Sequence, residues 1–176
     1  MKVVVINGRE RSGKDLFVYK CLIVNNGKVM TTSMVDGAKG IAREIGWTGS
    51  KEPRDRKFLS DLKDLLDEYN DYSFTYVEES IAGLCKIFPK NFLEDYIVFI
   101  MARQPEDIER LVKKYNAKTV LIRRAAAEEA EPSNHADANV FNYNYDYEII
   151  NNGTLIELEE RAKDFVEEIL ENGIDY

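Results

Sequence analysis

The residues whose types and spacing most clearly indicate chemistry are residues 8–15, Gly-Arg-Glu-Arg-Ser-Gly-Lys-Asp, directly after the apolar run 3–6. A strand that ends in Gly-x-x-x-x-Gly-Lys and leads into a helix directs backbone N–H groups, the helix N-terminus and one ammonium onto the same polyphosphate. Gly8 and Gly13 give the backbone the necessary reach, because a side chain there would block the turn or the phosphate. The segment is interpreted as a phosphate-binding loop made of Gly8, Arg9, Glu10, Arg11, Ser12, Gly13, Lys14 and Asp15.

Asp15 stands where the pattern usually has Ser or Thr, whose hydroxyl binds the Mg²⁺ that accompanies a nucleoside triphosphate. A carboxylate can take the same metal, directly or through water. The apolar strand that ends at Met101 and Ala102 lacks the acid that helps to hold this metal in many phosphate-loop proteins. We therefore expect Asp15 to supply part of the metal anchoring. The simpler alternative is a glycine turn followed by a surface lysine and an acid at a helix start.

Length, charge and cysteines limit the classes of protein that fit. A chain of 176 residues favours one domain over residues 1–176, large enough for a real core. The net charge of −8 argues against a nucleic acid polymer as partner but permits a small anionic ligand in a basic pocket. Cys21 and Cys85 lie among apolar residues without CxxC spacing, so we expect both to be buried and inert in a reducing compartment. The N-terminal apolar run is too short for a signal peptide or membrane span, which predicts a soluble cytoplasmic protein with no membrane partner.

Hydrophobic periodicity predicts alternating strands and helices, which is typical of a central parallel sheet covered on both faces. The expected class is α/β, with a three-layer α/β/α P-loop NTPase fold and a small helical lid. Strands are predicted at residues 3–6, 29–33, 96–101, 119–122 and 147–150. Helices are predicted from the loop to residue 22, around 38–45, over 55–69, 74–88 and 105–115, and after the capping box Thr154-x-x-Glu157, with a loop at 47–54.

Basic residues follow two of the predicted strands: Arg103 after 96–101, and Arg123 with Arg124 after 119–122. The carboxyl ends of parallel strands line the ligand crevice of an open sheet, so these arginines should converge on phosphates held near Lys14. The alternative for each arginine is a surface ion pair with one of the many acids.

Residues 125–139 begin as an alanine-rich acidic stretch and break at Pro132, which predicts the lid, or alternatively a solvated helical hairpin without a role. His135 lies within it and is expected to be an exposed residue. The aromatic residues 141, 143, 145 and 147 alternate with Asn and Asp, which places them on one side of an extended segment. Most such stripes are core, and the alternative is that one of them contacts a nucleotide base.

These residues together resemble the P-loop deoxynucleoside monophosphate kinases of bacteriophages and related bacterial genomes, within the adenylate kinase-like superfamily. The loop with Asp15 is similar to that group and also to animal-type phosphomevalonate kinases. Ser33-x-x-Asp36-x-x-Lys39 resembles the Ser-x-x-Asp-x-x-Arg segment that opens the monophosphate-binding helix, with Lys39 in place of the planar, bidentate arginine. Arg103 resembles the arginine on the acceptor phosphate, and Arg123 and Arg124 resemble those that flank the lid. Residues 146–155 match an ending that is mainly structural in such kinases.

The resemblance implies Mg²⁺-dependent transfer of the γ-phosphoryl group of ATP to a nucleoside or deoxynucleoside monophosphate. Lys14, Arg103, Arg123 and Arg124 would be catalytic, and the acceptor would contact Ser33, Asp36, Lys39, Trp47 and Arg103. Two alternatives remain: a kinase for another phosphorylated small molecule, as phosphomevalonate kinases are, or a nucleotide-binding protein without turnover. No Asn-Lys-x-Asp or Leu-Ser-Gly-Gly-Gln motif is present, which disfavours GTPases and transporter ATPases. The expected partners are small-molecule nucleotides, and a homodimer is compatible with the sequence.

Overall fold

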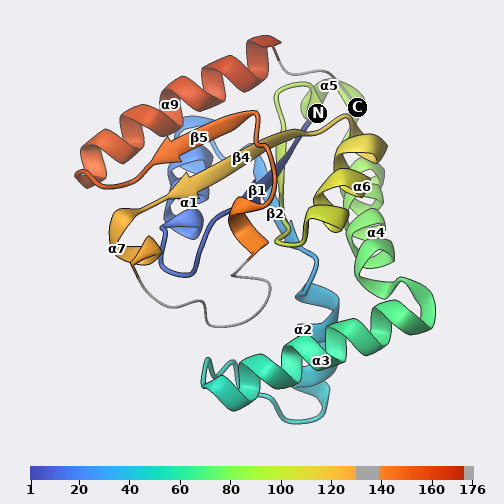
Figure 1. Ribbon diagram of the computed structural model, residues 1–176. Helices are drawn as coiled ribbons and strands as arrows, with labels where there is room; N and C mark the ends of the chain where they lie inside the picture. The colour runs from blue at the N-terminus through green and yellow to red at the C-terminus, as the bar shows by residue number, and fades with distance from the viewer. Residues whose placement is uncertain (130–138, 173–176) are drawn as a thin grey trace. The chain divides into compact units, whose positions relative to one another are not determined.

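The computed structural model describes residues 1–129 and 139–172. Within these residues one five-stranded sheet forms, in the order β2-β3-β1-β4-β5 (Figure 1). The strands are β1 (Lys2–Asn7), β2 (Val29–Ser33), β3 (Ile97–Met101), β4 (Lys118–Arg123) and β5 (Tyr147–Ile150). β1 pairs in parallel with β3 and β4, and β4 pairs in parallel with β5. Every predicted strand is found, within one or two residues at its ends.

The helices agree with the prediction except at two places. They are α1 (Lys14–Val24), α2 (Asp36–Glu44), α3 (Pro53–Asn70), α4 (Tyr72–Ile87), α5 (Lys90–Leu93), α6 (Pro105–Tyr115), α7 (Ala125–Glu128) and α9 (Leu155–Asn172), with a 3₁₀ turn η1 (Asn139–Phe141). α3 begins at Pro53, inside the predicted loop, because proline fits the first helical turn. The short helix α5 has no periodic signal of its own and was not predicted.

Three layers enclose the core, as the sequence predicts. α1 and α9 pack together on one face of the sheet, and α6 contacts β1 and β4 on the other (Figure 1). The Phe165 ring of α9 stands at the centre of the first layer, 5.5 Å from the ring of Phe17, 6.2 Å from that of Phe99 and 5.4 Å from that of Tyr147. β1 and β3 are buried almost throughout, which is why both strands read as continuous apolar runs.

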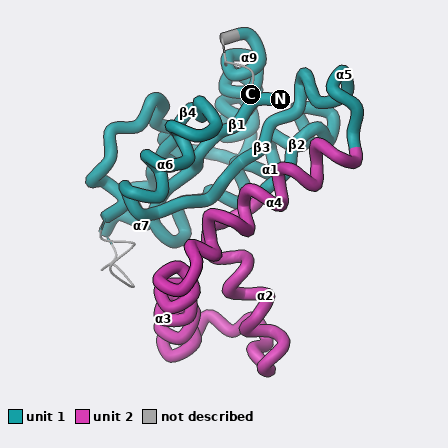
Figure 2. Tube along the Cα trace, turned by 90° about the vertical axis from the view of Figure 1, so that its right-hand side faces the viewer, with its two compact units in different colours: residues 1–31, 88–176 teal, residues 32–87 magenta. Residues whose placement is uncertain are grey.

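The chain divides into two compact units, residues 1–31 with 88–176, and residues 32–87 (Figure 2). One boundary falls inside β2 and the other at the end of α4, so neither is marked by a linker in the sequence. In the unit 32–87, α2, α3 and α4 pack on one another. Gly37 permits the close approach of α2 to α4, because a Cβ there would lie 2.7 Å from a ring carbon of Tyr72.

Several local expectations are decided by the structure. The capping box is confirmed: the Thr154 N–H donates to Glu157 Oε2 at 2.6 Å, and the Glu157 N–H donates to Thr154 Oγ1 at 3.3 Å. Cys21 is buried, which raises the pKa of its thiol to about 12, but Cys85 is exposed, so the prediction that both are buried is wrong for Cys85. Cys85 lies in the last turn of α4, where the residues 85–87 are exposed.

The aromatic stripe is not one extended segment, because Phe141 ends η1 and is 40% exposed. α7 covers the first residues of the predicted lid, and η1 begins at its last residue, Asn139. Residues 130–138 of the predicted lid, including His135, lie outside the described residues. In residues 1–129 and 139–172, no helix combines the length and the apolar character that a bilayer crossing requires.

Candidate active site

The loop between β1 and α1 has a backbone that only glycine allows at its two ends. Gly8 has φ +150° and Gly13 has φ +94°, and Arg11 between them has φ 61°. A Cβ on Gly8 would lie 2.5 Å from the carbonyl oxygen of Ile122 and 2.7 Å from Ser12 Oγ. A Cβ on Gly13 would collide with the side-chain amide of Asn151. Both glycines therefore have the steric reason that the sequence pattern indicates.

Lys14 curls back over this loop. Its Nζ donates to the carbonyl oxygen of Gly8 at 2.5 Å and to that of Arg9 at 3.0 Å. α1 begins at Lys14, and Gly13 at its N-cap provides no side-chain cap. The ammonium group and the positive end of the helix thus lie at the same loop, an arrangement that attracts an anion.

Ser12 supplies a further polar group inside the loop. The residue is 1% exposed, and its Oγ has no hydrogen-bond partner within the described residues. A buried hydroxyl without a hydrogen-bond partner destabilises the folded state, because it has lost its bonds to water. A hydrogen-bond acceptor that enters the loop could therefore bind the Ser12 hydroxyl without displacing water from it. The Ser12 N–H donates to the carbonyl of Arg9 at 3.2 Å, which closes the turn.

Two asparagines hold the loop from outside. Asn7 Oδ1 accepts the N–H of Gly8 at 2.8 Å, and Asn151 Nδ2 donates to the carbonyl of Ser12 at 2.8 Å. Sequence reasoning did not select Asn7, and it treated Asn151 only as part of a structural ending. A polar residue at the last position of an apolar strand, directly before Gly8, was the available signal for Asn7.

Strand register places Arg103 close to the loop. Ile6 pairs with Met101 and Asn7 pairs with Leu121, so β1, β3 and β4 end at the same edge of the sheet. Asn7 Nδ2 donates to the carbonyl of Arg103 at 3.3 Å. The turn that carries Arg103 is therefore tied to the residue from which the loop departs.

Arg123 ends β4 at the same edge, but its side chain is engaged by acids. Its Nε and Nη2 donate to the two carboxylate oxygens of Glu128 at 2.9 and 2.8 Å, and Nη1 lies 3.4 Å from Glu148 Oε2. The hydrogen bond from Arg123 lowers the pKa of Glu128, and the bond to Glu128 raises the pKa of Arg123. Bidentate charge-assisted pairs of this kind are the strong ones.

Arg9 and Phe141 lie next to Arg123. We name the four residues Arg9, Arg123, Glu128 and Phe141 the corner after β4. The guanidinium carbon of Arg9 lies 5.2 Å from the centre of the Phe141 ring, and that of Arg123 lies 5.4 Å from it. Arg9 Nη1 also donates to the carbonyl of Glu128 at 2.9 Å. Arg124 is exposed at the N-cap of α7. Arg11 is exposed too, with Nε 3.9 Å from Glu10 Oε1.

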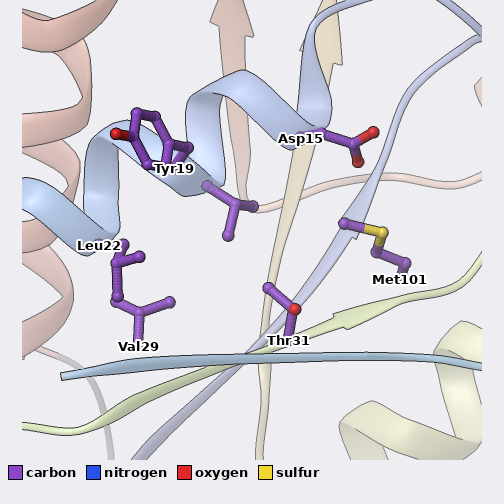
Figure 3. Close-up of a pocket in the computed structure, with 7 residues that line it drawn as sticks. Asp15, Tyr19, Leu22, Val29, Thr31 and Met101 are labelled. Atoms are coloured by element: carbon purple, nitrogen blue, oxygen red, sulfur yellow. The ribbon is translucent and has the colours of Figure 1, made fainter. Parts of the chain in front are cut away.

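Asp15 lies in the first turn of α1, at the loop end of a pocket of about 310 Å³ (Figure 3). Tyr19 and Leu22 follow along α1, and Met101 stands at the end of β3. In the described part of the chain, no three His, Cys, Asp or Glu side chains gather as a metal cluster would require. One exposed carboxylate at the end of the glycine loop is compatible with Mg²⁺, which usually takes one or two carboxylates and completes its shell with phosphate oxygens and water. Asp15 therefore fits this metal.

Four of the five residues predicted to contact an acceptor, Ser33, Asp36, Lys39 and Trp47, lie in the unit 32–87, whereas Arg103 lies in the other unit. Ser33 Oγ accepts the N–H of Val35 at 3.3 Å, and Lys39 Nζ donates to Asp36 Oδ1 at 2.8 Å. Trp47 Nε1 donates to the carbonyl of Ser50 at 3.2 Å, and Arg43 lies over its ring at 5.5 Å. The structure brings Ser33, Asp36 and Lys39 together at the start of α2, within their own unit.

The fold and this loop define a three-layer α/β/α protein with a strand, glycine loop and helix unit at the carboxyl edge of its sheet. No protein-family model matches the chain, and no curated protein matches it. Among solved structures, it is similar to an unliganded crystal structure of a sugar kinase from Janibacter sp., with 16% identity over 95% of both chains and a TM-score of 0.46. Similarity at this level is not evidence for an activity.

Proposed function

We propose that this protein is a kinase that transfers the γ-phosphoryl group of ATP to the phosphate of a nucleoside or deoxynucleoside monophosphate. The observation that carries the proposal is the loop of residues 8–15: Lys14 Nζ donates to the carbonyls of Gly8 and Arg9 at the start of α1, where Gly13 provides no side-chain cap. An incoming phosphate can replace these neutral carbonyls, because an ion pair with an oxyanion is the stronger contact for an ammonium group. The resemblance in loop and strand-end motifs directs the choice of acceptor.

In the proposed reaction, an oxygen of the acceptor phosphate forms a bond to the γ-phosphorus, and the bond from that phosphorus to the bridging oxygen of ADP breaks. The acceptor oxygen is already ionised near neutral pH, so no protein base is required. The protein must align two anions and neutralise the charge of the transferring group. Bound Mg²⁺ would neutralise part of the triphosphate charge, with Asp15 as its protein ligand.

Each candidate residue has a proposed role. Lys14 and the loop N–H groups bind the β- and γ-phosphates of ATP. Arg103, on the turn tied to Asn7, holds the acceptor phosphate. Arg123 binds the transferring phosphoryl group after its side chain releases Glu128. Arg124 is the second cation at the end of β4. Ser33, Asp36, Lys39 and Trp47 are assigned to the acceptor by the resemblance alone.

The test is production of ADP from ATP and Mg²⁺ in the presence of each common ribo- and deoxyribonucleoside monophosphate. Turnover on one or a few of them, lost in Lys14→Ala, is the expected result and names the acceptor. Lys20→Ala is a matched control, since Lys20 lies on the same helix and pairs with Glu159 at 2.6 Å instead of with the loop. Binding of ATP without turnover on any monophosphate would contradict the proposed acceptor class.

A further inference from the structure

A short stretch after the predicted lid contacts several parts of the candidate site. Residues 139–145, which we name the connector, run from η1 towards β5. Asn139 Nδ2 donates to Gln104 Oε1 at 3.2 Å, directly after Arg103. Phe141 lies under the guanidinium groups of Arg9 and Arg123. The connector thus contacts the turn after β3, the loop and the end of β4.

The Tyr145 hydroxyl links this connector to Asn7, the last residue of β1. Its hydroxyl accepts from Asn7 Nδ2 at 2.8 Å and donates to the carbonyl of Val140 at 2.8 Å. Asn7 is fully buried, and its amide also serves Gly8 and Arg103. One tyrosine hydroxyl and one asparagine amide therefore join the loop, the Arg103 turn and η1 in a continuous chain of hydrogen bonds.

The Tyr145 hydroxyl is suited to this role because it keeps its proton. Burial raises the pKa of Tyr145 to about 12, so the hydroxyl donates to Val140 throughout the physiological range. The buried Asn7 Nδ2 in turn depends on the Tyr145 hydroxyl. Its hydrogen bond to that hydroxyl is 2.8 Å long, and its hydrogen bond to the Arg103 carbonyl is longer, at 3.3 Å. Without the hydroxyl, Asn7 Nδ2 would keep only the longer of these two bonds. Buried polar groups that lose a partner rearrange or pay the cost of dehydration.

We propose that Tyr145 is a positioning residue of the site: through Asn7 it sets the first N–H of the loop and the Arg103 turn relative to the connector. The role assigned to Arg103 rests on the proposed function, but the coupling itself does not. Loss of the hydroxyl should disturb the acceptor side more than the triphosphate side, because the same Asn7 nitrogen bonds directly to the Arg103 carbonyl, whereas Lys14 contacts Gly8 through the Gly8 carbonyl and not through the N–H that Asn7 accepts.

The test compares Tyr145→Phe with Tyr143→Phe. Tyr143 is a matched control, because it is another connector tyrosine, its ring packs on that of Tyr145 at 5.2 Å, and in the described residues its hydroxyl is not a partner of Asn7. Residue-resolved hydrogen exchange at the Gly8 amide gives a readout that needs no catalysis. We expect Tyr145→Phe to speed this exchange about fivefold or more, and Tyr143→Phe to leave it within about twofold.

Kinetics give the second readout. Tyr145→Phe should raise the KM for the acceptor about tenfold while the KM for ATP changes less than about twofold. Unchanged exchange at Gly8 in Tyr145→Phe, or a KM for ATP that rises as much as the KM for the acceptor, would overturn the proposal. If the wild-type protein turned over no monophosphate, the kinase proposal would fail, and the exchange measurement would still decide the role of Tyr145.

Discussion

The loop after β1 and the corner after β4 each present a cation at the same edge of the sheet, but they hold it by different means. Lys14 lies on two backbone carbonyls, whereas Arg123 is held by the carboxylates of Glu128 and Glu148. A phosphate can displace a neutral carbonyl readily, but it must compete with a carboxylate for a guanidinium group. We therefore expect an anion to bind Lys14 directly, and to bind Arg123 only after Glu128 releases that side chain.

An arginine at the end of a strand is therefore not always available to bind a phosphate. The sequence predicts correctly where Arg123 lies along β4, while the partner of its side chain depends on which acid lies near it in space. Glu128, in the first turn of α7, is the acid that lies 2.8 Å from Arg123 Nη2. We therefore expect substitutions at the loop to change the activity more than substitutions near Arg123.

The largest effect is expected for Lys14→Ala. Lys14→Ala removes the ammonium group that donates to the loop carbonyls, so turnover should fall by about 10²-fold or more. Steady-state kinetics with ATP and the acceptor found in the panel measure this loss. Lys20→Ala should retain activity within about twofold, and an equal loss in both variants would refute the special place given to Lys14.

Asp15→Ala should have the next largest effect. Asp15 is exposed at the start of α1, so its removal should leave the melting temperature nearly unchanged. Turnover should fall about tenfold, and the Mg²⁺ concentration that gives half-maximal rate should rise, because the metal loses its protein ligand. A magnesium titration of initial rates measures both. Full activity with an unchanged magnesium requirement in Asp15→Ala would show that this carboxylate does not hold the metal.

A smaller effect, of opposite sign, is expected for Glu128→Gln. Loss of the carboxylate frees Arg123 from its bidentate pair, so kcat should rise up to about threefold. Glu148→Gln is the matched control, since its contact with Arg123 is longer at 3.4 Å and its effect should be smaller. If Glu128→Gln instead slowed the reaction as much as Arg123→Ala, the ion pair itself, and not its release, would be what the reaction needs.

The smallest effect concerns the pH dependence of stability. The pKa of Glu128 is lowered from 4.5, so its pair with Arg123 stabilises the folded state above the ordinary pKa of a glutamate, and this stabilisation is lost as the pH falls through the lowered pKa. The melting temperature of Glu128→Gln should therefore lie below that of the wild type at pH 7 by about 2 °C or less, and the difference should vanish in acid. Melting curves of both proteins from pH 7 to pH 3 measure this, and a difference that grew in acid would contradict the assignment.

Much of the fold could be predicted because its signals are local. Continuous apolar runs predict β1 and β3, Pro105 predicts the start of α6, and Thr154 with Glu157 predicts the start of α9. The loop could be predicted for the same reason, since all of its residues are adjacent in the chain. Leu155 shows the limit of periodicity: it belongs to the apolar set of α9 but is 62% exposed, because it is the first residue of the helix.

The parts that could not be predicted depend on contacts between distant residues. Asn7 and Tyr145 are 138 positions apart, and only the finished sheet brings them together. The division of the chain was invisible for a related reason, because both of its boundaries lie in or beside regular elements and not in a linker.

The most direct test of the central claim is a calorimetric titration of the wild-type protein and of Lys14→Ala with ATP and Mg²⁺. The account predicts saturable binding of one ATP per chain to the wild type, and affinity at least about tenfold weaker for Lys14→Ala, because the loop holds a triphosphate through this ammonium group. Equal affinity of the two proteins, or no binding of ATP by the wild type, would contradict the assignment of residues 8–15 as a nucleotide phosphate site.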